Sequence, residues 1–210
     1  MKILMFGGSG TLGTELQKYL DCDAPDHFDI DITDNQLFIY TPRFYSGYDL
    51  IIHLAAYIDV MKAEKEREKC FKVNVEGTIN LLKAFSGIPF VYMSTEDAFN
   101  PVNFYSETKL AGEIAVKALS KNYLIIRTLF KAVPYPYDQA FIDRWTCGDE
   151  VTIIAPLIAK AIKKWDKKSK LIYVGTGRKT FYDFAVKSKP NVKKCSIKDI
   201  KGVKLHSDYR

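Results

Sequence analysis

Residues 2–13 read KILMFGGSGTLG, and the rest of the chain is interpreted outward from this stretch. It begins with a short apolar run, Lys2–Phe6, which is typical of a buried strand. The glycines that follow, Gly8, Gly10 and Gly13, fit the pattern Gly-x-Gly-x-x-Gly. Between a strand and a helix, glycines permit a tight turn and let the backbone approach a pyrophosphate closely. The stretch therefore predicts a dinucleotide-binding turn, and a turn that binds no ligand is the alternative.

The segment after the first predicted helix is expected to contact the adenosine part of such a ligand. An acidic residue about 20 positions after the turn commonly meets the ribose. Asp31 has the best spacing, ahead of Asp23, Asp26 and Asp29. Asp31 also opens the run Asp31–Asp34, which can lie beside the adenine instead. No arginine is nearby to receive a 2′-phosphate, which favours NAD over NADP while leaving both open.

Beyond the turn, nearly continuous apolar strands alternate with helices. The strands are expected at residues 49–56, 89–94, 123–129 and 170–174, and the helices at residues 11–20, 62–71, 73–85, 103–120, 155–165 and 179–187. This alternation predicts an α/β fold with a Rossmann-type, doubly wound parallel sheet. Two further elements are expected, a short strand around residues 28–32 and a helix near residues 139–145.

A break in this pattern suggests how the chain divides. Residues 134–137, Pro-Tyr-Pro-Tyr, interrupt the alternation of strands and helices. We therefore predict an NAD(P)-binding Rossmann domain over residues 1–132. Residues 133–210 are predicted to form a small, reduced substrate-binding lobe that is interleaved with the first domain.

The composition is that of an ordinary soluble globular protein and excludes several classes. Hydrophobic residues make up 47% and charged residues 27% of the 210 positions. No apolar run approaches the roughly 20 residues that span a bilayer. The four cysteines are scattered without a Cys-x-x-Cys pair, and the three histidines are isolated, so no metal site is predicted. We expect a reduced, cytoplasmic protein.

The charge is distributed unevenly along the chain. Residues 160–210 hold 16 of the 31 Lys and Arg but only 4 of the 25 Asp and Glu. Such a basic segment is consistent with an anionic partner such as a nucleotide diphosphate, or with a solvated lysine-rich surface. No basic motif interleaved with aromatic residues is present, so we do not expect a nucleic-acid partner.

Tyr105 and Lys109 are candidates for acid–base chemistry. They are four residues apart in a predicted helix and so share one face of it. At an effective dielectric near 20, an ammonium about 4 Å from a phenolate is worth about three pK units. Such a phenol can exchange a proton with a substrate oxygen near neutral pH, and the hydroxyl of Thr95 can hold that oxygen. This spacing also occurs by chance in helices. The glycine turn earlier in the chain supports the acid–base interpretation.

Six segments carry a resemblance to one protein family. They are His53–Ala56, Ala55–Glu64, Val73–Leu81, Ser94–Phe99, Tyr105–Glu113 and Ile126–Thr128. On these segments the chain resembles the extended short-chain dehydrogenase/reductases, and within them the dTDP-4-dehydrorhamnose reductases. The similarity is dense up to about residue 130 and faint beyond it. The resemblance implies NAD(P)-dependent reduction of a nucleotide-activated 4-keto sugar, with NAD or NADP as cofactor and a possible homodimer formed through residues 73–85 and 103–120.

The resemblance also implies roles for individual residues. Tyr105 would be the general acid, Lys109 would lower its pKa and bind the nicotinamide ribose, and Thr95 would hydrogen-bond the substrate oxygen, with Ser94 as the fallback. The expected cofactor contacts are Gly7, Gly10, Thr11, Leu12, Gly13, Asp31, Ile32, Leu54, Ala55, Ala56, Tyr105 and Lys109. Structural roles are expected for His53, Asn74 and Arg127.

Several positions depart from the family's motifs. Ile58 and Met61 replace polar signature residues, Asp97 stands where the family has a tyrosine, and the interval from Thr95 to Tyr105 is short. Two alternatives therefore stay open. One is an epimerase or dehydratase of the same family, which returns the hydride to its substrate. The other is a non-catalytic, regulatory protein that binds a dinucleotide.

Overall fold

The central sheet is built from buried apolar strands, of which β1 (Ile3–Phe6) is the first. The computed structural model describes residues 1–37, 39 and 45–208. The other strands of the sheet are β2 (Leu50–His53), β3 (Phe90–Thr95), β4 (Tyr123–Thr128) and β9 (Lys170–Tyr173). Their order is β1-β2-β3-β4-β9, and each neighbouring pair is parallel. The predicted Rossmann-type parallel sheet is confirmed.

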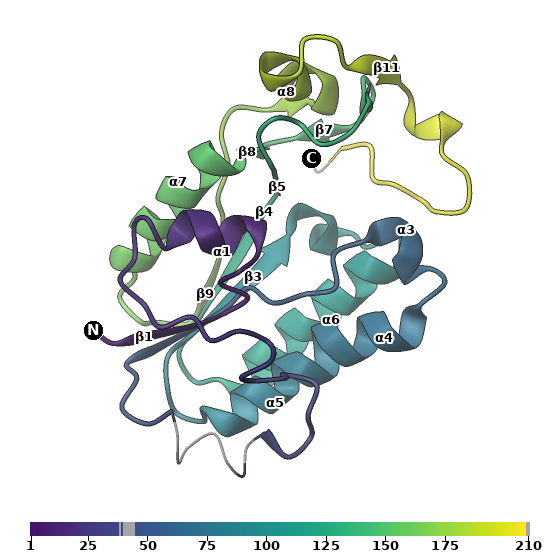
Figure 1. Cartoon of the computed structure of the whole chain (residues 1–210). Coiled ribbons are helices and arrows are strands. Elements are labelled where there is room, and N and C mark those ends of the chain that lie inside the picture. Colours follow the sequence, from purple (N-terminus) through teal and green to yellow (C-terminus); the bar gives the residue numbers. More distant parts are fainter. Residues whose placement is uncertain (38, 40–44, 209–210) are drawn as a thin grey trace.

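Helices cover both faces of this sheet (Figure 1). One face carries α1 (Thr11–Leu16) and α7 (Val151–Lys163), and the other carries α5 (Gly77–Ala84) and α6 (Phe104–Leu119). Because successive side chains of a strand point to opposite faces, Ile3 and Met5 pack with α1 and α7. Leu4 and Phe6 belong to the core under α5 and α6. Both faces of β1 are therefore buried, as its uninterrupted apolar run predicts.

Three short helical segments connect β2 to α5. They are α3 (Val60–Ala63), α4 (Arg67–Phe71) and the π-helix η1 (Lys72–Glu76). The predicted helices at residues 62–71 and 73–85 are thus present but divided. Between β3 and α6 lies a single 3-10 turn, η2 (Glu96–Phe99), which immediately follows Thr95.

A smaller lobe caps the carboxyl end of the sheet (Figure 1). Its elements are β5 (Phe130–Lys131), β6 (Gln139–Phe141), β7 (Trp145–Thr146), β8 (Asp149–Glu150), β10 (Lys179–Thr180), α8 (Phe181–Ser188), β11 (Lys193–Cys195) and η3 (Ile197–Asp199). They pair as β5–β8, β6–β11 and β7–β10. Six buried residues form a separate core here: Tyr135, Ala140, Phe181, Phe184, Ala185 and Val192.

Two predicted elements are wrong. Residues 28–32 form turns, because the carbonyl oxygen of Asp26 accepts the amide of Ile30 and the amide of Asp26 donates to the side chain of Asp29. In this part of the chain, the contact with β1 is a single bridge between Leu4 and Asp23. Residues 139–145 form strands β6 and β7 where a helix was expected, since β6 pairs with the distant β11.

The boundary between the two parts of the chain stays a prediction. Residues 1–132 and 133–210 were expected to form interleaved domains. In the structure β9 belongs to the central sheet and α7 packs against α1, although both lie beyond residue 132. We take α7 and β9 to belong with the central sheet.

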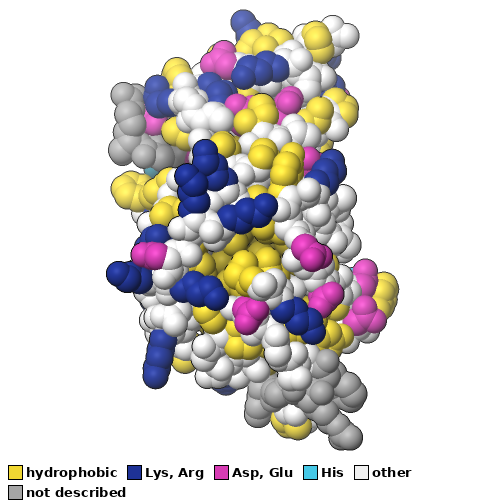
Figure 2. Space-filling model, turned by 90° about the vertical axis from the view of Figure 1, so that its left-hand side faces the viewer, with side chains coloured by type: hydrophobic (Ala, Val, Ile, Leu, Met, Phe, Trp, Pro, Cys, Tyr) yellow, Lys and Arg dark blue, Asp and Glu magenta, His cyan; other side chains and the backbone are white. Residues whose placement is uncertain are grey.

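Charged side chains of both signs are mixed on one face of the molecule (Figure 2). On the face shown in Figure 2, Lys and Arg side chains are scattered with Asp and Glu among them and form no continuous patch. Within the described ranges, no helix has the length and apolar character needed to cross a membrane. The same residues contain no group of three His, Cys, Asp or Glu side chains placed to hold a metal ion.

Candidate active site

The glycine turn between β1 and α1 is shaped by close backbone contacts. Gly7 has a φ of +87°, and a Cβ there would lie 2.6 Å from the amide nitrogen of Ala55. A Cβ on Gly13 would lie 2.3 Å from the carbonyl oxygen of Gly7. Neither position has room for a side chain, and Gly7 occupies the left-handed region that glycine adopts without strain. The motif residues therefore allow β1, α1 and the end of β2 to meet in direct contact.

This turn lines a cavity of about 390 Å³. Cofactor pockets are usually about 300–1,000 Å³, so the volume suits a nucleotide ligand. Ten residues expected from the sequence to bind a cofactor line this cavity: Gly7, Gly10, Thr11, Leu12, Gly13, Asp31, Ile32, Leu54, Ala55 and Ala56. Tyr105 and Lys109, which were also expected there, are not among its lining residues. The crowded backbone at Gly7 and Gly13 and the donor-rich turn fit a dinucleotide.

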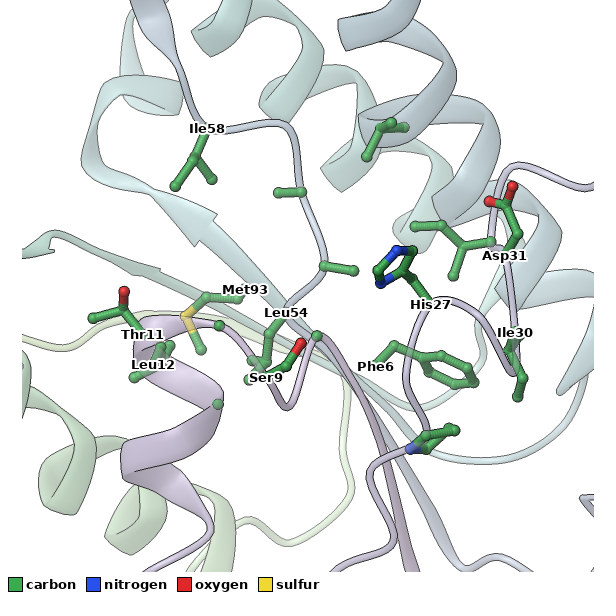
Figure 3. Close-up of a pocket in the computed structure, with 18 of the residues that line it drawn as sticks. Phe6, Ser9, Thr11, Leu12, His27, Ile30, Asp31, Leu54, Ile58 and Met93 are labelled. Atoms are coloured by element: carbon green, nitrogen blue, oxygen red, sulfur yellow. The ribbon is translucent and has the colours of Figure 1, made fainter.

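The cavity extends between two ends, which Figure 3 separates clearly. Ser9, Thr11, Leu12 and Met93 lie on one side of it, and His27 and Asp31 lie on the other. A ligand that fills the cavity therefore runs from the end of β3 across the glycine turn to the segment after α1.

Asp31 is the acidic residue that the fold places in this cavity. Its Oδ1 accepts hydrogen bonds from the amide and the hydroxyl of Thr33, both at 2.8 Å, which fixes the carboxylate. Asp23 instead accepts the hydroxyl of Tyr48 at 2.7 Å. Of the four aspartates considered from the sequence, only Asp31 lines the cavity. None of the described residues that line the cavity is Lys or Arg.

The start of α6 sets the positions of Tyr105 and Lys109. Asn103 caps the helix, because its side chain accepts the amide of Ser106 at 2.9 Å while the Ser106 hydroxyl accepts the amide of Asn103 at 3.2 Å. This capping box fixes the first residue of the helix. Tyr105 therefore lies in the first turn and Lys109 one turn later. The Thr95 hydroxyl, at the end of β3, is near enough to Tyr105 to lower the pKa of that phenol.

Lys109 is buried against an aromatic ring. Its Nζ lies 4.4 Å from the centroid of the Tyr92 ring, a cation–π distance. Burial lowers the pKa of Lys109 to about 7, and Glu113 and Cys70 oppose that shift. Gly112 leaves the space that Tyr92 occupies, because a Cβ there would lie 2.2 Å from the Tyr92 hydroxyl oxygen. Lys109 thus changes protonation near neutral pH.

The pKa of Tyr105 differs from the expectation drawn from its spacing. Burial raises this pKa above its ordinary value, because the phenolate is poorly solvated. Among the neighbours, Asp97 and Cys70 raise it further, while Thr95 and Arg144 lower it. The expected lowering by Lys109 is therefore wrong for this structure. In the state described, Tyr105 holds its proton and can act as a donor.

Ser94, the fallback for Thr95, is engaged in a buried network. Its hydroxyl donates to Glu113 at 2.6 Å, and Arg127 donates to both oxygens of the same carboxylate at 2.8 Å. Arg127 also donates to the hydroxyl of Tyr173 at 2.7 Å. This network fastens α6 to β3 and β4. Ser94 and Arg127 therefore have structural partners, and Thr95 is the hydroxyl of the pair that acts on the pKa of Tyr105.

His53 and Asn74 also have structural partners. His53 Nε2 lies 3.0 Å from the hydroxyl of Thr78, and burial lowers the pKa of His53 to about 3, which keeps the ring neutral. Asn74 accepts the amide of Tyr57 at 2.8 Å and donates to the hydroxyl of Thr108 at 2.9 Å. Asn74 thereby ties the loop after β2 to α6.

Some residues of the cavity were not singled out from the sequence. Met93 lines it from β3 and Phe130 from β5, two residues beyond the end of β4, and Ser9 lies inside the glycine stretch. The rule that ligands bind at the carboxyl ends of parallel strands could have found the first two. His27 depends on the irregular path of residues 21–34, for which the sequence carries no periodic signal.

Comparison with known proteins places this site in a family. Residues 1–155 match the family model described as RmlD substrate binding domain. The dTDP-4-dehydrorhamnose reductase of Sinorhizobium fredii (strain NBRC 101917 / NGR234) is 33% identical over 127 residues, which cover 51% of this chain and 42% of that protein. The dTDP-4-dehydrorhamnose reductase of Escherichia coli (strain K12) is 29% identical over 230 aligned positions, which cover 88% of this chain and 76% of that protein.

A solved structure agrees in fold over nearly the whole chain. The crystal structure of dTDP-4-dehydrorhamnose reductase from Bacillus anthracis str. Ames, in complex with NADP, has a TM-score of 0.83 at 26% identity and covers 98% of this chain and 88% of that one. The chain spans less than half of the Sinorhizobium relative's length. The resemblance to the extended short-chain dehydrogenase/reductases is confirmed. Since the family model covers 155 of the 210 residues, the chain belongs to the RmlD substrate binding domain family.

Proposed function

We propose that this chain is an NAD(P)-dependent reductase of a nucleotide-activated 4-keto sugar. The observation that carries the proposal is that the Thr95 side chain acts on the pKa of Tyr105 at the end of the strand that reaches the cavity of the glycine turn. Met93, two residues before Thr95 on β3, lines that cavity and connects the two. The relatives named dTDP-4-dehydrorhamnose reductase support the same activity and make dTDP-4-dehydrorhamnose the first substrate to test.

The cofactor is proposed to occupy the cavity, with its pyrophosphate on the glycine turn and its adenosine near Asp31. A bound dihydronicotinamide would supply the hydride for the reduction. The carboxylate of Asp31 supports NAD, since it can accept the ribose 2′-hydroxyl. The relative solved in complex with NADP supports the other cofactor. NAD and NADP should therefore both be tested.

Two side chains are proposed to act on the substrate carbonyl, and a third on the cofactor. Tyr105 Oη donates its proton to the carbonyl oxygen as the π electrons of the C=O bond move onto that oxygen. The Thr95 hydroxyl binds the same oxygen and keeps it within reach of Tyr105. Lys109, one helical turn away, is proposed to bind the ribose next to the nicotinamide.

Replacing Tyr105 by Phe tests this proposal. We expect Y105F to oxidise NADPH and NADH about 10²–10⁴-fold more slowly with dTDP-4-dehydrorhamnose, because the proton donor is lost. Cofactor affinity, measured by calorimetric titration, should not change. The matched control is Tyr19→Phe at an exposed position just after α1, and it should keep full activity. Turnover by Y105F at the wild-type rate would contradict the mechanism.

The same assay separates the alternatives. An epimerase or dehydratase would convert substrate without net consumption of NAD(P)H. A match of 30% identity over 115 residues to a UDP-N-acetylglucosamine 4,6-dehydratase (inverting) of Campylobacter jejuni favours testing this. A non-catalytic protein would bind the cofactor and then fail to bind any sugar nucleotide.

Two further properties stay predictions. A homodimer through α5 and α6 is supported by exposed apolar side chains on α6, where Ile114 is 59% and Leu119 is 47% exposed. Sedimentation would show one species of twice the chain mass. The cytoplasmic location expected from the composition is tested by fractionation of cells.

A further inference from the structure

The short turn between Thr95 and Tyr105 is held by the small lobe through two carboxylates. Glu96 accepts the hydroxyl of Thr146 at 2.7 Å and the amide of Cys147 at 3.2 Å. Asp97 accepts Nη2 of Arg144 with both of its oxygens, at 3.0 and 3.1 Å. The residues that bind Glu96 and Asp97 all come from positions 144–147, close to 50 residues later in the chain. The loop that follows Thr95 is therefore attached directly to the small lobe.

The pair formed by Asp97 and Arg144 is buried. Its side chains are only 6% and 9% exposed. The Arg144 guanidinium lies 4.6 Å from the centroid of the Phe181 ring at the start of α8. The backbone carbonyl oxygen of Arg144 accepts the amide of Phe181 at 3.0 Å. Arg144 is thus seated in the core of the small lobe. Burying two charges carries a large desolvation penalty, which their contact must offset.

This ion pair is directly connected to the proposed catalytic side chains. The amide of Asp97 donates to the Thr95 hydroxyl oxygen at 3.3 Å, and the Thr95 side chain in turn lowers the pKa of Tyr105. Asp97 raises the pKa of Tyr105, and Arg144 lowers it. Neither residue is expected from the family's motifs, in which a tyrosine stands at position 97.

We propose that Asp97 and Arg144 are positioning residues for the proton donor. From the small lobe, Arg144 holds the turn that bonds Thr95, and it balances the negative charge that Asp97 brings near Tyr105. This inference rests on the proposed function, because it assigns these residues a role in the same proton transfer.

The physical reason lies in the charge that proton transfer creates. When Tyr105 gives its proton to the substrate oxygen, a phenolate remains, and an unbalanced Asp97 would oppose its formation. Arg144 offsets that repulsion. Among the described residues, the other groups that face this cluster are Cys70 and Tyr92 near Tyr105, and Glu96, Lys131 and Tyr135 near the ion pair.

Three variants test the proposal in steady-state kinetics: Asp97→Asn, Arg144→Gln and the double variant D97N/R144Q. R144Q should lower kcat about 10- to 100-fold, the effect of a displaced catalytic group, and should leave the KM for NAD(P)H unchanged. The reduction requires protonated Tyr105, so activity is lost as the pH rises through its pKa. R144Q should move this alkaline limit to higher pH and D97N to lower pH. The double variant should return it toward that of the wild type.

A purely structural role predicts a different pattern. It would lower the Tm of both single variants and restore it in the double variant, and it would leave the alkaline limit in place. Arg144→Lys keeps the charge and should recover most of the activity that R144Q loses. Alkaline limits that do not move, or that move in the same direction in both single variants, would overturn the proposal.

A second measurement needs no turnover. With 3,5-difluorotyrosine at position 105, fluorine lowers the phenol pKa into a range that fluorine NMR can follow, and its titration midpoint should rise in R144Q and fall in D97N. If no 4-keto sugar is reduced but these midpoints shift as stated, the proposed function fails and the charge coupling stands. If the sugar is reduced and the midpoints stay fixed, the coupling fails and the proposed function stands.

Discussion

The cofactor end of the candidate site is shaped by backbone, and the catalytic end by side chains. At the cofactor end the shape comes from the backbone, because Gly7 and Gly13 bring β1, α1 and β2 into direct contact. At the catalytic end the shape comes from buried ionisable side chains, among them Lys109 and Glu113. One end is therefore sensitive to added volume, and the other is sensitive to changed charge. Four substitutions can break or sharpen this contrast.

The largest effect is expected from Gly13→Ala. Its Cβ would lie 2.3 Å from a backbone oxygen, which has no flexible side chain to yield. We expect the free energy of unfolding to fall by about 5 kcal/mol or more, beyond the usual cost of overpacking, with loss of cofactor binding. Gly177→Ala is the matched control, since a Cβ there meets nothing within 4 Å. Thermal unfolding of both variants measures the difference, and an equal Tm would refute the steric account.

The next largest effect is expected from Glu113→Gln, which keeps the shape of the side chain and removes its charge. The guanidinium of Arg127 would then be buried without its counter-ion, at a cost of about 3 kcal/mol or more. Glu15→Gln, in the surface pair with Lys18, should change stability by less than about 1 kcal/mol. Urea unfolding compares the two, and similar losses would show that the buried network contributes no more than a surface pair.

Lys109→Met should change how stability depends on pH. The pKa of Lys109 falls from 10.5 to about 7 on folding, so the unfolded chain binds more protons between these values. Wild-type stability therefore rises from pH 7 toward pH 10. Lys109→Met should lack this rise and be more stable at pH 7 by on the order of a few kcal/mol.

Unfolding midpoints recorded from pH 6 to pH 10 measure this effect. Lys117→Met, at an exposed position on the same helix, is the control and should follow the wild-type curve. A wild-type curve that is flat over this range would contradict the lowered pKa of Lys109.

The smallest effect is expected at the other end, from Asp31→Asn. This change removes the negative charge near the proposed ribose position while keeping an acceptor for Thr33. We expect the ratio of NADH to NADPH affinity to fall about tenfold, which corresponds to roughly 1.4 kcal/mol. Calorimetric titration with each cofactor measures it. A constant ratio would remove Asp31 from the adenosine site.

The same contrast explains what the sequence allowed us to predict. The glycine turn and the parallel strands are local patterns, so the fold and ten of the cavity residues could be named in advance. The strands at residues 139–146 could not, because they form only by pairing with β10 and β11 about 35–55 residues later. Local propensity there favoured a helix, and tertiary pairing prevailed.

The electrostatics of the catalytic end were beyond reach for a related reason. The spacing of Tyr105 and Lys109 suggested a lowered phenol pKa, but it carries no information on burial, which outweighs the charge. Arg144 is 47 residues away from Asp97, and no motif connects them. Charges that meet only in the folded chain have no signature in the order of residues.

The place of β9 at the edge of the sheet has a consequence for how the protein is made. A ribosome releases Tyr123–Thr128 of β4 well before Lys170–Tyr173, which must lie alongside it. Seven of the 19 buried residues under α1 and α7 come from positions 151–165 and emerge just before β9. At roughly 5–20 residues per second, the nascent chain keeps one face of its sheet uncovered for several seconds. During that interval, the half-finished sheet is the form that a chaperone would meet.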